Sequence, residues 1–417
     1  MNSVSRSAVS DNPELQPGLV SDEGDSGALP PLVLHASIAT PPPTDSPRSN
    51  AVIQRFSLQS SARVLLPGWR VGNCMRVPSR SLVEVYHHAE FAAASYGGLQ
   101  TCGSVHVCPV CSSKIAERRK IEVTAGLTTW ADRGGGFVLA TFTLRHELGD
   151  SLTRVAAALN GAYREIKRSK AWASFERRYG VIGSIAAREY THGRHGWHPH
   201  LHVVFFTRGG LTAREIRQLE SWLAQRWASA VGRLGGFASL DHAVTCRRGA
   251  RNDADYVTKA GRSWSLGDEL VKSNSKGGRR GSRSVPQLLG AAGRGDELAG
   301  RLFQEYAHWT YRTNALVWSR GLRAALGLVV EEKTDEEIAG ELLEGARLLV
   351  VLEREQWRVI LAHDARAEVL LVASAGDVGR VAGFLAQFGI DLAGWQLAGQ
   401  AVGNLSESFE SETGATS

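Results

Sequence analysis

Three histidines alternate along one short run of the chain, Trp197-His198-Pro199-His200-Leu201-His202. A β-strand directs successive side chains to opposite faces, so His198, His200 and His202 would share one face if this run is a strand. Two imidazoles two residues apart on a rigid strand are well placed to bind one cation. The spacing therefore predicts a metal site, and the alternative is a solvated strand face that happens to be rich in histidine.

A carboxylate is expected beside these imidazoles. The preceding residues read as a strand, and a turn centred between Arg194 and His195 would place Glu189 directly opposite His200. Cross-strand neighbours on one face lie about 5 Å apart. A carboxylate with two imidazoles is a mixed nitrogen and oxygen site, which suits Mg²⁺ or Mn²⁺ better than a thiolate-rich zinc site would.

A tyrosine follows this region in Asp253-Ala-Asp-Tyr-Val-Thr-Lys259. On a helix Tyr256 and Lys259 are three residues apart and share a face. A phenol is a poor nucleophile until a nearby cation stabilises its phenolate, and the same cation would neutralise a phosphate. Taken alone the pair is a weak signal, because surface and core tyrosines are common, so its value lies in its position after the histidine strand.

Four of the five cysteines lie close together in the first third of the chain. Cys108-Pro-Val-Cys111 is a tight knuckle that can present two thiolates to one zinc ion, and Cys74 and Cys102 can complete four ligands. His106 is a spare candidate ligand, and buried free thiols are the alternative. An odd number of cysteines argues against a disulfide framework, and the fifth, Cys246, is expected to pack inside a strand.

The charge of the chain is unevenly distributed. The net charge is +6, but residues 51–330 carry +20 while the two flanks together carry −14. A segment of that charge favours a polyanion partner, since each Lys or Arg that meets a phosphate releases counterions. A generally solvated basic surface would give the same count. No secretory signal or long apolar span is seen, so we expect a cytoplasmic protein without a membrane partner.

The elements that must position these residues follow a β-α-β-β-α-β-α order. We expect strands at 137–144, 181–190, 198–206 and 237–246, and helices at 151–167, 212–231 and 252–260. Thr212 and Glu215 would form a capping box at the second helix. This order predicts an α+β fold, a ferredoxin-like or RRM-like antiparallel sheet with helices on one face.

The rest of the chain divides by composition. We expect disorder in residues 1–50 and 403–417. A Cys-rich zinc-binding region would cover residues 51–130 and end in a helix at 112–129. The core with a helical extension would cover 131–330, and an acidic α/β module would cover 331–402. The extension would be helical over 297–326. The module would open with a Thr334–Glu337 capping box and contain strands at 357–362 and 368–372 and a helix at 378–388. A basic loop offers candidate DNA-binding side chains, or is an ordinary solvated loop: Lys272, Lys276, Arg279, Arg280 and Arg283.

Three short motifs together resemble a known family. They are Leu139-Ala-Thr-Phe-Thr-Leu144, then His200-Leu-His202 followed by Val-Val-Phe205, then Tyr256-Val-Thr-Lys259. The chain resembles the rolling-circle replication initiators of plasmids in the HUH endonuclease superfamily, and most closely those of high-GC Gram-positive plasmids. The resemblance extends from about residue 102 to residue 326.

The resemblance implies a function and a mechanism. Such an initiator binds the plasmid double-strand origin, where a hairpin or unwound segment exposes one strand. His200, His202 and Glu189 would hold the cation, with His198 a weaker candidate, and Tyr256 would attack the scissile phosphate and become linked to its 5′ side. The freed 3′-OH would prime the host polymerase, with a host helicase as a further partner. Lys259 would position the cation or the phosphate.

One position departs from the family pattern. Some relatives carry a glutamate four residues before the tyrosine for the termination step, and this chain has Asn252 there. Asp253 and Asp255 are the nearby candidates for that acid or base. A related relaxase or transposase is one alternative, although relaxases place the tyrosine before the histidines. A non-catalytic origin-binding regulator is the other. The sequence leaves open a homodimer and the role of the acidic module.

Overall fold

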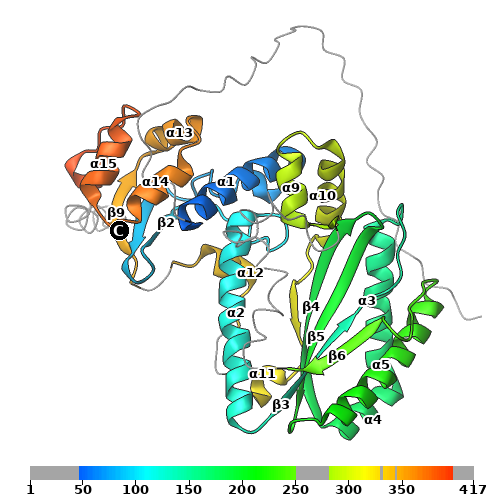
Figure 1. Ribbon diagram of the computed structural model, residues 1–417. Coiled ribbons are helices and arrows are strands. Elements are labelled where there is room, and N and C mark those ends of the chain that lie inside the picture. The colour runs from blue at the N-terminus through cyan, green and yellow to red at the C-terminus, as the bar shows by residue number, and fades with distance from the viewer. Residues whose placement is uncertain (1–46, 250–280, 329–331, 343–344, 398–417) are drawn as a thin grey trace, which may run out of the picture. The chain divides into compact units, whose positions relative to one another are not determined.

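The computed structural model describes residues 47–249, 281–328, 332–342 and 345–397, and Figure 1 shows a mixed α+β chain with two antiparallel sheets. The strands are β1 (Val83–His88), β2 (Ala93–Gly97), β3 (Gly136–Phe142), β4 (Val181–Gly193), β5 (Gly196–Thr207), β6 (Val244–Arg248), β7 (Arg283–Ser284), β8 (Leu316–Trp318) and β9 (Arg347–Leu352).

The helices are α1 (Pro47–Leu65), α2 (Pro109–Asp132), α3 (Leu152–Arg168), α4 (Lys170–Tyr179), α5 (Ala213–Arg233), α9 (Val285–Ala292), α10 (Glu297–Thr310), α11 (Leu322–Ala325), α12 (Asp335–Gly340), α13 (Arg354–Ala362), α14 (Arg366–Ala373) and α15 (Val378–Ala386). Short 3₁₀ turns occur at Arg70–Gly72, Ala89–Phe91 and Gly394–Gln396. No helix of the described residues is both long enough and apolar enough to span a bilayer.

The larger sheet has the strand order β6-β3-β5-β4-β7, with every neighbouring pair antiparallel. Its first four strands follow the predicted β-α-β-β-α-β sequence of elements, with α4 as an unpredicted helix between α3 and β4. The strand β8 pairs with β4 beside β7, along Ile185 to Ala187. The long β4–β5 hairpin, which carries the histidines, is therefore held in the interior of a sheet.

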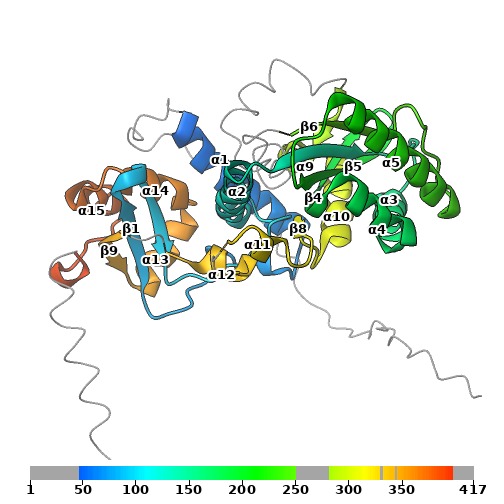
Figure 2. The ribbon, with the colours of Figure 1, turned by 90° about the horizontal axis from the view of Figure 1, so that it is seen from below.

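The two faces of this sheet have separate apolar cores. Val138, Leu201, Val203 and Phe205 are buried with residues of α3, α4 and α5, as predicted for the helix-covered face. On the opposite face Leu139, Val204 and Phe206 pack with residues of α2 and α11, so the expectation of helices on one face only was wrong (Figures 1 and 2). The apolar half of this second face needs a cover of its own, because exposed Val and Phe side chains are costly.

The capping signals in the sequence were good guides to helix starts. The Thr212 side chain accepts a hydrogen bond from the Glu215 backbone N–H at 3.3 Å, and the Glu215 carboxylate accepts one from the Thr212 backbone N–H at 2.8 Å. The reciprocal bonds satisfy backbone groups that a helix start leaves without partners, so α5 begins where predicted. The box at Thr334 and Glu337 forms in the same way at α12.

Two predicted elements have other limits. The strand predicted at 237–246 begins only at Val244. This residue pairs with Phe142 and is the first of β6 to pair with β3. The helix predicted over 297–326 ends at Thr310, and Arg312 has a φ of +56° that a right-handed helix cannot accommodate. The chain then turns into β8, because Leu316 to Trp318 supply backbone partners for an edge of β4.

The C-terminal region contains helices where strands were predicted. Residues 357–362 and 368–372 lie in α13 and α14, and the strand of this region is β9. Trp357 and Ile360 are buried three residues apart, which is helical spacing, whereas the apolar run of β9 is buried almost continuously. The helix predicted at 378–388 is present as α15.

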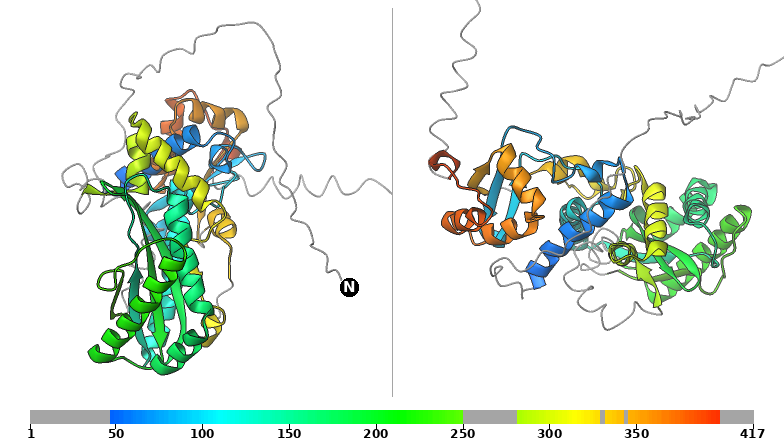
Figure 3. Two further views of the ribbon diagram at one scale, coloured as in Figure 1. Left: turned by 90° about the vertical axis from the view of Figure 1, so that its right-hand side faces the viewer. Right: turned by 90° about the horizontal axis from the view of Figure 1, so that it is seen from above.

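The smaller sheet joins distant parts of the chain. Its order is β2-β1-β9, so two strands from the Cys-rich region pair with one strand from the acidic region (Figures 2 and 3). Val83 and Val85 of β1 share one core with Leu349 of β9 and with Trp357 and other residues of the C-terminal helices. The predicted domain limits remain predictions, but regions 51–130 and 331–402 build this layer together.

Candidate functional site

The cysteine knuckle sits at the start of α2. Cys108 is the N-cap residue, Pro109 is the first residue of the helix, and the Cys108 sulfur accepts from the Cys111 backbone N–H at 3.5 Å. Proline fits this position because its missing N–H would lack a helical partner anyway. The first turn thereby directs two thiols to one point, where the helix dipole also favours negative charge.

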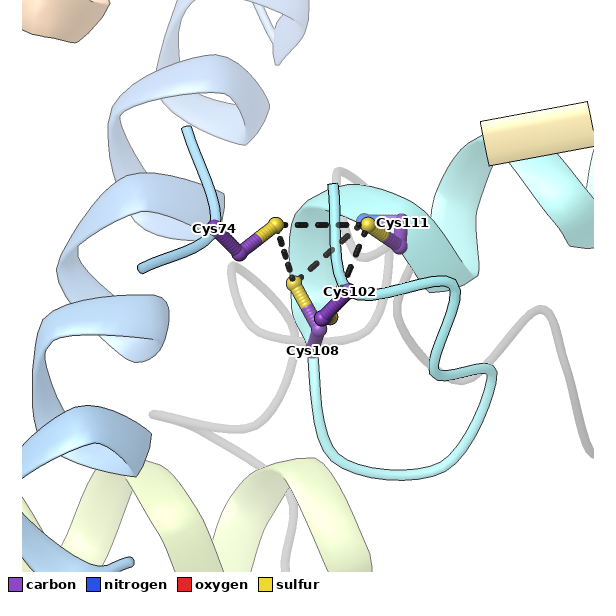
Figure 4. Close-up of side chains that lie close together, drawn as sticks. All are labelled: Cys74, Cys102, Cys108 and Cys111. Atoms are coloured by element: carbon purple, nitrogen blue, oxygen red, sulfur yellow. Dashed lines mark hydrogen bonds between the residues drawn. The ribbon is translucent and has the colours of Figure 1, made fainter. Parts of the chain in front are cut away.

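The other two cysteines converge on the same point, as Figure 4 shows. The sulfur atoms of Cys74, Cys102, Cys108 and Cys111 all lie within 4.8 Å of one another, and all four residues are buried. The separations are 3.4 Å from Cys74 to Cys111, 3.6 Å from Cys74 to Cys108, and 3.7 Å from Cys102 to Cys111. A tetrahedral zinc site with Zn–S bonds near 2.3 Å has sulfur–sulfur edges of about 3.8 Å, so this group could bind Zn²⁺.

The polar surroundings favour a thiolate at Cys108, while hydrogen bonds within the cluster and burial raise the pKa values of Cys74 and Cys102. Burial alone would raise the pKa of Cys108, but hydrogen bonds from the three other cysteines and from the Cys111 backbone N–H hold it well below its ordinary value. The Gln59 side-chain amide also donates to the Cys108 sulfur at 3.3 Å. His106 is not part of the group, because its ring contacts the Tyr306 hydroxyl and the Thr313 carbonyl, each at 3.0 Å.

The histidine strand has the register that its sequence predicts. The hairpin closes between Gly193 and Gly196, so Arg194 and His195 form the turn, and Glu189 pairs directly with His200. The same register places Thr191 opposite His198 and Ala187 opposite His202. The three imidazoles share one face, beyond the part of that face that α2 and α11 cover.

The Glu189 carboxylate contacts His202, which lies two residues along β5 from its strand partner His200. Glu189 Oε2 lies 3.0 Å from His202 Nε2, and the other ring nitrogen of His202 lies 3.1 Å from Thr141 Oγ1 on β3. The ring centroids of His200 and His202 are 5.8 Å apart, and those of His198 and His200 are 4.1 Å apart. Residues from three adjacent strands thus orient a row of imidazoles.

His200 has the properties of an available ligand. Its Nδ1 atom is buried and has no hydrogen-bond partner among the described residues. Burial lowers the pKa of His200 to about 4 and that of His198 to about 3, so both rings are neutral at pH 7, the form that binds metals. Imidazole nitrogens and a carboxylate are donor types that divalent cations bind. This donor set is less compact than the cysteine cluster, which is the only group of three or more such donors within 4.8 Å in the described part of the chain.

Three neighbours of the histidines, Thr141, Thr143 and His146, were missed by the sequence reasoning. His146 lies with its ring centroid 4.5 Å from that of His198, and the Thr143 hydroxyl lies 3.2 Å from His198 Nε2. Thr141 and Thr143 alternate along the first motif, so the strand periodicity could have placed them beside the imidazoles. No local signal pointed to His146.

Most of the other predicted site residues lie outside the described residues. These are Tyr256, Lys259, Asp253, Asp255, Lys272, Lys276, Arg279 and Arg280, together with the helix predicted at 252–260. Arg283 is described, and its guanidinium pairs with the Asp296 carboxylate at 2.8 Å. Cys246 lies on β6 opposite Ala140, a packing position as predicted.

The described flanks of residues 250–280 are both on the histidine-bearing sheet. On one side β6 ends at Arg248, which pairs with Val138 of β3. On the other side β7 pairs Ser284 with Thr191, the residue opposite His198. The segment that contains Tyr256 is therefore anchored at both ends to the sheet that carries the candidate ligands.

Comparison with known proteins gives two relatives. The chain is 29% identical over 294 residues to a protein named Protein rep from Streptomyces lividans, covering 55% of this chain and 64% of that protein. It is a distant and partial relative of Protein rep. It is also 33% identical over 150 residues to a protein named Neomycin resistance protein from Streptomyces cyanogenus, covering 30% of this chain and 34% of that protein. The chain thus spans less than two thirds of either relative. No family model and no solved structure matches it.

Proposed function

We propose that this chain is a plasmid replication initiator that nicks one strand of its origin DNA through a tyrosine and a divalent cation. The relationship to Protein rep supports a role in replication. The charge of +20 over residues 51–330 supports a polyanionic partner, and it is unfavourable for a polyamine drug such as neomycin. The sheet order β6-β3-β5-β4, with α3 and α5 on one face, supports the HUH type of nuclease core.

The observation that carries the proposal is the pairing of Glu189 with His200 and its contact with His202. These three residues would hold the cation, and His198 would be a weaker contributor. A bound Mg²⁺ or Mn²⁺ would supply Lewis-acid stabilisation of the negative charge on the scissile phosphate.

The protein's own groups prepare this site. The Thr141 hydroxyl and the Glu189 carboxylate contact opposite nitrogens of the His202 ring and so fix its orientation. The low pKa of His200 keeps its ring neutral, so no proton competes with a cation for the ring nitrogen at pH 7. The site lies on a sheet face, where a DNA strand can approach from solvent.

Tyr256 is close enough along the chain to serve as the nucleophile. It follows the end of β6 at Arg248 by eight residues. Four extended residues followed by four residues of the helix predicted at 252–260 span up to about 20 Å. Arg248 is two strands from Phe205 of β5, and His200 is five residues farther along β5. That separation is roughly 20 Å from strand spacing and rise, so the tether permits the contact.

In the proposed reaction the Tyr256 oxygen forms a bond to phosphorus while the bond from phosphorus to the 3′ oxygen breaks. The phenol proton is lost to a base, the 3′ oxygen takes up a proton, and the products are a 5′-phosphotyrosyl link and a free 3′-OH. Lys259, one turn away on the predicted helix, would stabilise the phenolate or the phosphate. Asp253 or Asp255 would act in the later transfer that ends the cycle, with host helicase and polymerase acting in between.

Two other functions fit parts of these data. A related relaxase or transposase would use the same histidines with another DNA substrate. A non-catalytic origin-binding regulator would use the sheet and the cysteine cluster but would need neither Glu189 nor Tyr256.

A nicking assay on supercoiled plasmid separates these functions. The full chain is incubated with plasmid carrying the cognate origin, with Mg²⁺ or Mn²⁺ and with EDTA. We expect cation-dependent conversion to the open circle by the native chain and by Tyr190→Phe, a matched change of a buried tyrosine, but not by Tyr256→Phe. Origin binding without a nick, or full nicking by Tyr256→Phe, would refute the proposal.

A further inference from the structure

Each of the four cluster ligands is linked to the C-terminal segment through a nearby residue. Here the C-terminal segment means the described part of residues 335–373, from α12 to α14. The first link runs through Gln59, which is 2% exposed. Its amide nitrogen donates to the Cys108 sulfur at 3.3 Å, and its amide oxygen accepts from the Arg366 guanidinium at 3.0 Å. One residue therefore connects a cluster thiolate to a cation of α14.

Arg366 is the most buried charge in this part of the structure, with 1% of its surface exposed. Its nearest carboxylate is that of Asp364, at 3.5 Å and largely exposed. A buried cation requires negative charge nearby. Four thiolates around one divalent ion carry net negative charge, so the cluster would supply it through Gln59.

The loop that carries Cys74 is held by two residues of the same segment. Arg366 donates to the Met75 carbonyl at 3.2 Å, and the Trp357 indole N–H donates to the Arg76 carbonyl at 2.6 Å. Trp357 is itself buried in the core of the small sheet. These two bonds fix the backbone on the C-terminal side of the Cys74 ligand.

Residues close to the remaining two ligands contact α12 and the residue after it. Lys114, one helical turn after Cys111, donates to the carbonyls of Ala339, at 3.1 Å, and Glu341. Gly103, next to Cys102, packs so closely on α12 that an added Cβ would lie 2.9 Å from the Glu336 Cα atom. Gly103 also has a φ of +62°, so the close approach and the turn both require glycine.

From these contacts we propose that the four-cysteine centre is a metal-dependent clamp that docks the C-terminal segment on the N-terminal region. Binding of Zn²⁺ fixes Cys74, Cys102, Cys108 and Cys111, and with them the four surfaces that α12, α13 and α14 contact. The dependence is mutual, because anything that stabilises the docked state over the released state must bind that state more tightly. The clamp gives the acidic C-terminal module a role that is independent of the proposed nicking activity.

The clamp also determines the shape of a cavity of about 1120 Å³. One wall is formed by α12, through Asp335 and Glu336, and another by Cys102 and Gly103 of the cluster loop. Trp69, Tyr311 and Arg312 are among the other lining residues. Release of the C-terminal segment would remove the α12 wall, so metal loss would open this cavity.

The first test measures zinc and docking in the full-length chain. Zinc transfer to a chromophoric chelator gives the affinity, and hydrogen exchange of α13 and α14 gives the docking. We expect Arg366→Met to weaken zinc binding by about 10–100-fold, as is usual for groups that support metal ligands, and to speed exchange in α14. Arg358→Met changes an exposed residue of α13 that pairs with Glu355, so it is the matched control and should do neither.

A second pair of variants separates charge from folding. Gln59→Met leaves the Arg366 cation in place but removes both the donor to Cys108 and the amide oxygen that accepts from Arg366. Arg366→Lys keeps the cation and the Gln59 amide. We expect Gln59→Met to weaken zinc binding in a chain with native circular dichroism, and Arg366→Lys to retain more zinc than Arg366→Met. Native zinc affinity in Gln59→Met, or equal losses in the two Arg366 variants, would overturn the charge link.

Chelation of the native chain tests the clamp itself. We expect zinc removal to speed hydrogen exchange in α12, α13 and α14 while α3 and α5 of the large sheet keep their protection. Unchanged exchange in the C-terminal helices would overturn the proposal. So would equal loss of protection in α3 and α5, because the metal would then support the whole fold rather than one docked segment.

Discussion

The cysteine cluster and the histidine strand are both donor groups, yet they are built in opposite ways. The four thiols are buried, lie within 4.8 Å of one another and come from loops and a helix start. The imidazoles stand on one face of a strand, with His198 and His200 only partly buried, and the carboxylate of Glu189 is 29% exposed. A closed set of four ligands is typical of a structural site, whereas an incomplete and accessible set leaves room for substrate.

The difference also concerns what supports each group. The cysteines depend on contacts from residues hundreds of positions away, such as Arg366 through Gln59. The histidines depend on adjacent strands, through Thr141 and Glu189. Loss of the cluster should therefore destabilise the docked C-terminal segment, and loss of a histidine should reduce the proposed chemistry while the fold persists.

The largest effect is expected from Cys108→Ser, which removes the N-cap ligand. Structural zinc supplies on the order of 10 kcal/mol in small zinc-binding peptides, and even a third of this would lower Tm by roughly 5 °C in a chain of this size. Zinc content measured by mass spectrometry should fall from one ion per chain to none, with a matching loss in a thermal melt. Cys246→Ser is the control, and equal effects of the two changes would contradict the assignment.

The next largest effect is expected from His202→Ala. It should lower cation-dependent nicking at least about 100-fold, because cation stabilisation of a phosphate amounts to several kcal/mol. Zinc content and the melting temperature should stay close to those of the native chain. Loss of zinc in this variant would show that the two groups are not separate.

A smaller effect is expected in the pH dependence of stability, measured without added Mg²⁺ or Mn²⁺. Burial, and then His200 and His146, lower the pKa of His198 to about 3, and burial lowers that of His200 to about 4. An unfolded histidine titrates near 6.5, so the unfolded chain binds protons first and stability falls as pH drops from 6.5 towards 4.

Urea titrations between pH 7 and 5 test this sign in samples that retain zinc. The double variant His198→Gln/His200→Gln should lose less stability over this interval than the native chain. His195→Gln, in the exposed hairpin turn, should behave like the native chain. An unchanged slope in the double variant would contradict the lowered pKa values.

The smallest effect is expected from Thr141→Val, which removes the hydroxyl 3.1 Å from His202 Nδ1. A net hydrogen bond of about 0.5–1.5 kcal/mol corresponds to roughly a 2–10-fold higher cation concentration for half-maximal nicking. Val and Thr have similar shapes, so the fold should be unaffected. A loss as large as that of His202→Ala would instead assign Thr141 a direct part in the reaction.

The histidine strand was largely predictable from sequence because its order is local. The alternation of His198, His200 and His202 and a two-residue turn determine the register that brings Glu189 opposite His200. Cys108 and Cys111 were equally clear, since an N-cap and its third helical residue meet within one turn. The partners Cys74 and Cys102 were plausible on composition alone, and the structure confirms that they join the group.

What could not be predicted depends on long-range packing. Residues 357–362 and 368–372 are short apolar runs whose periodicity is ambiguous, and their burial against β1 and β9 decides in favour of helices. Arg366 reads as a surface residue until Gln59 and Met75 are placed beside it. Sequence spacing carries no information about pairs more than 290 residues apart.

Peptide mapping of the DNA adduct tests most directly whether Tyr256 forms the covalent link to DNA. The full chain is incubated with Mn²⁺ and a single-stranded oligonucleotide that contains the nick site, then digested with protease and nuclease. Mass spectrometry should find a 5′-phosphonucleotide on the peptide that contains Tyr256, and none after Glu189→Gln or with EDTA. An adduct on any other residue, or cleavage without an adduct, would contradict the account.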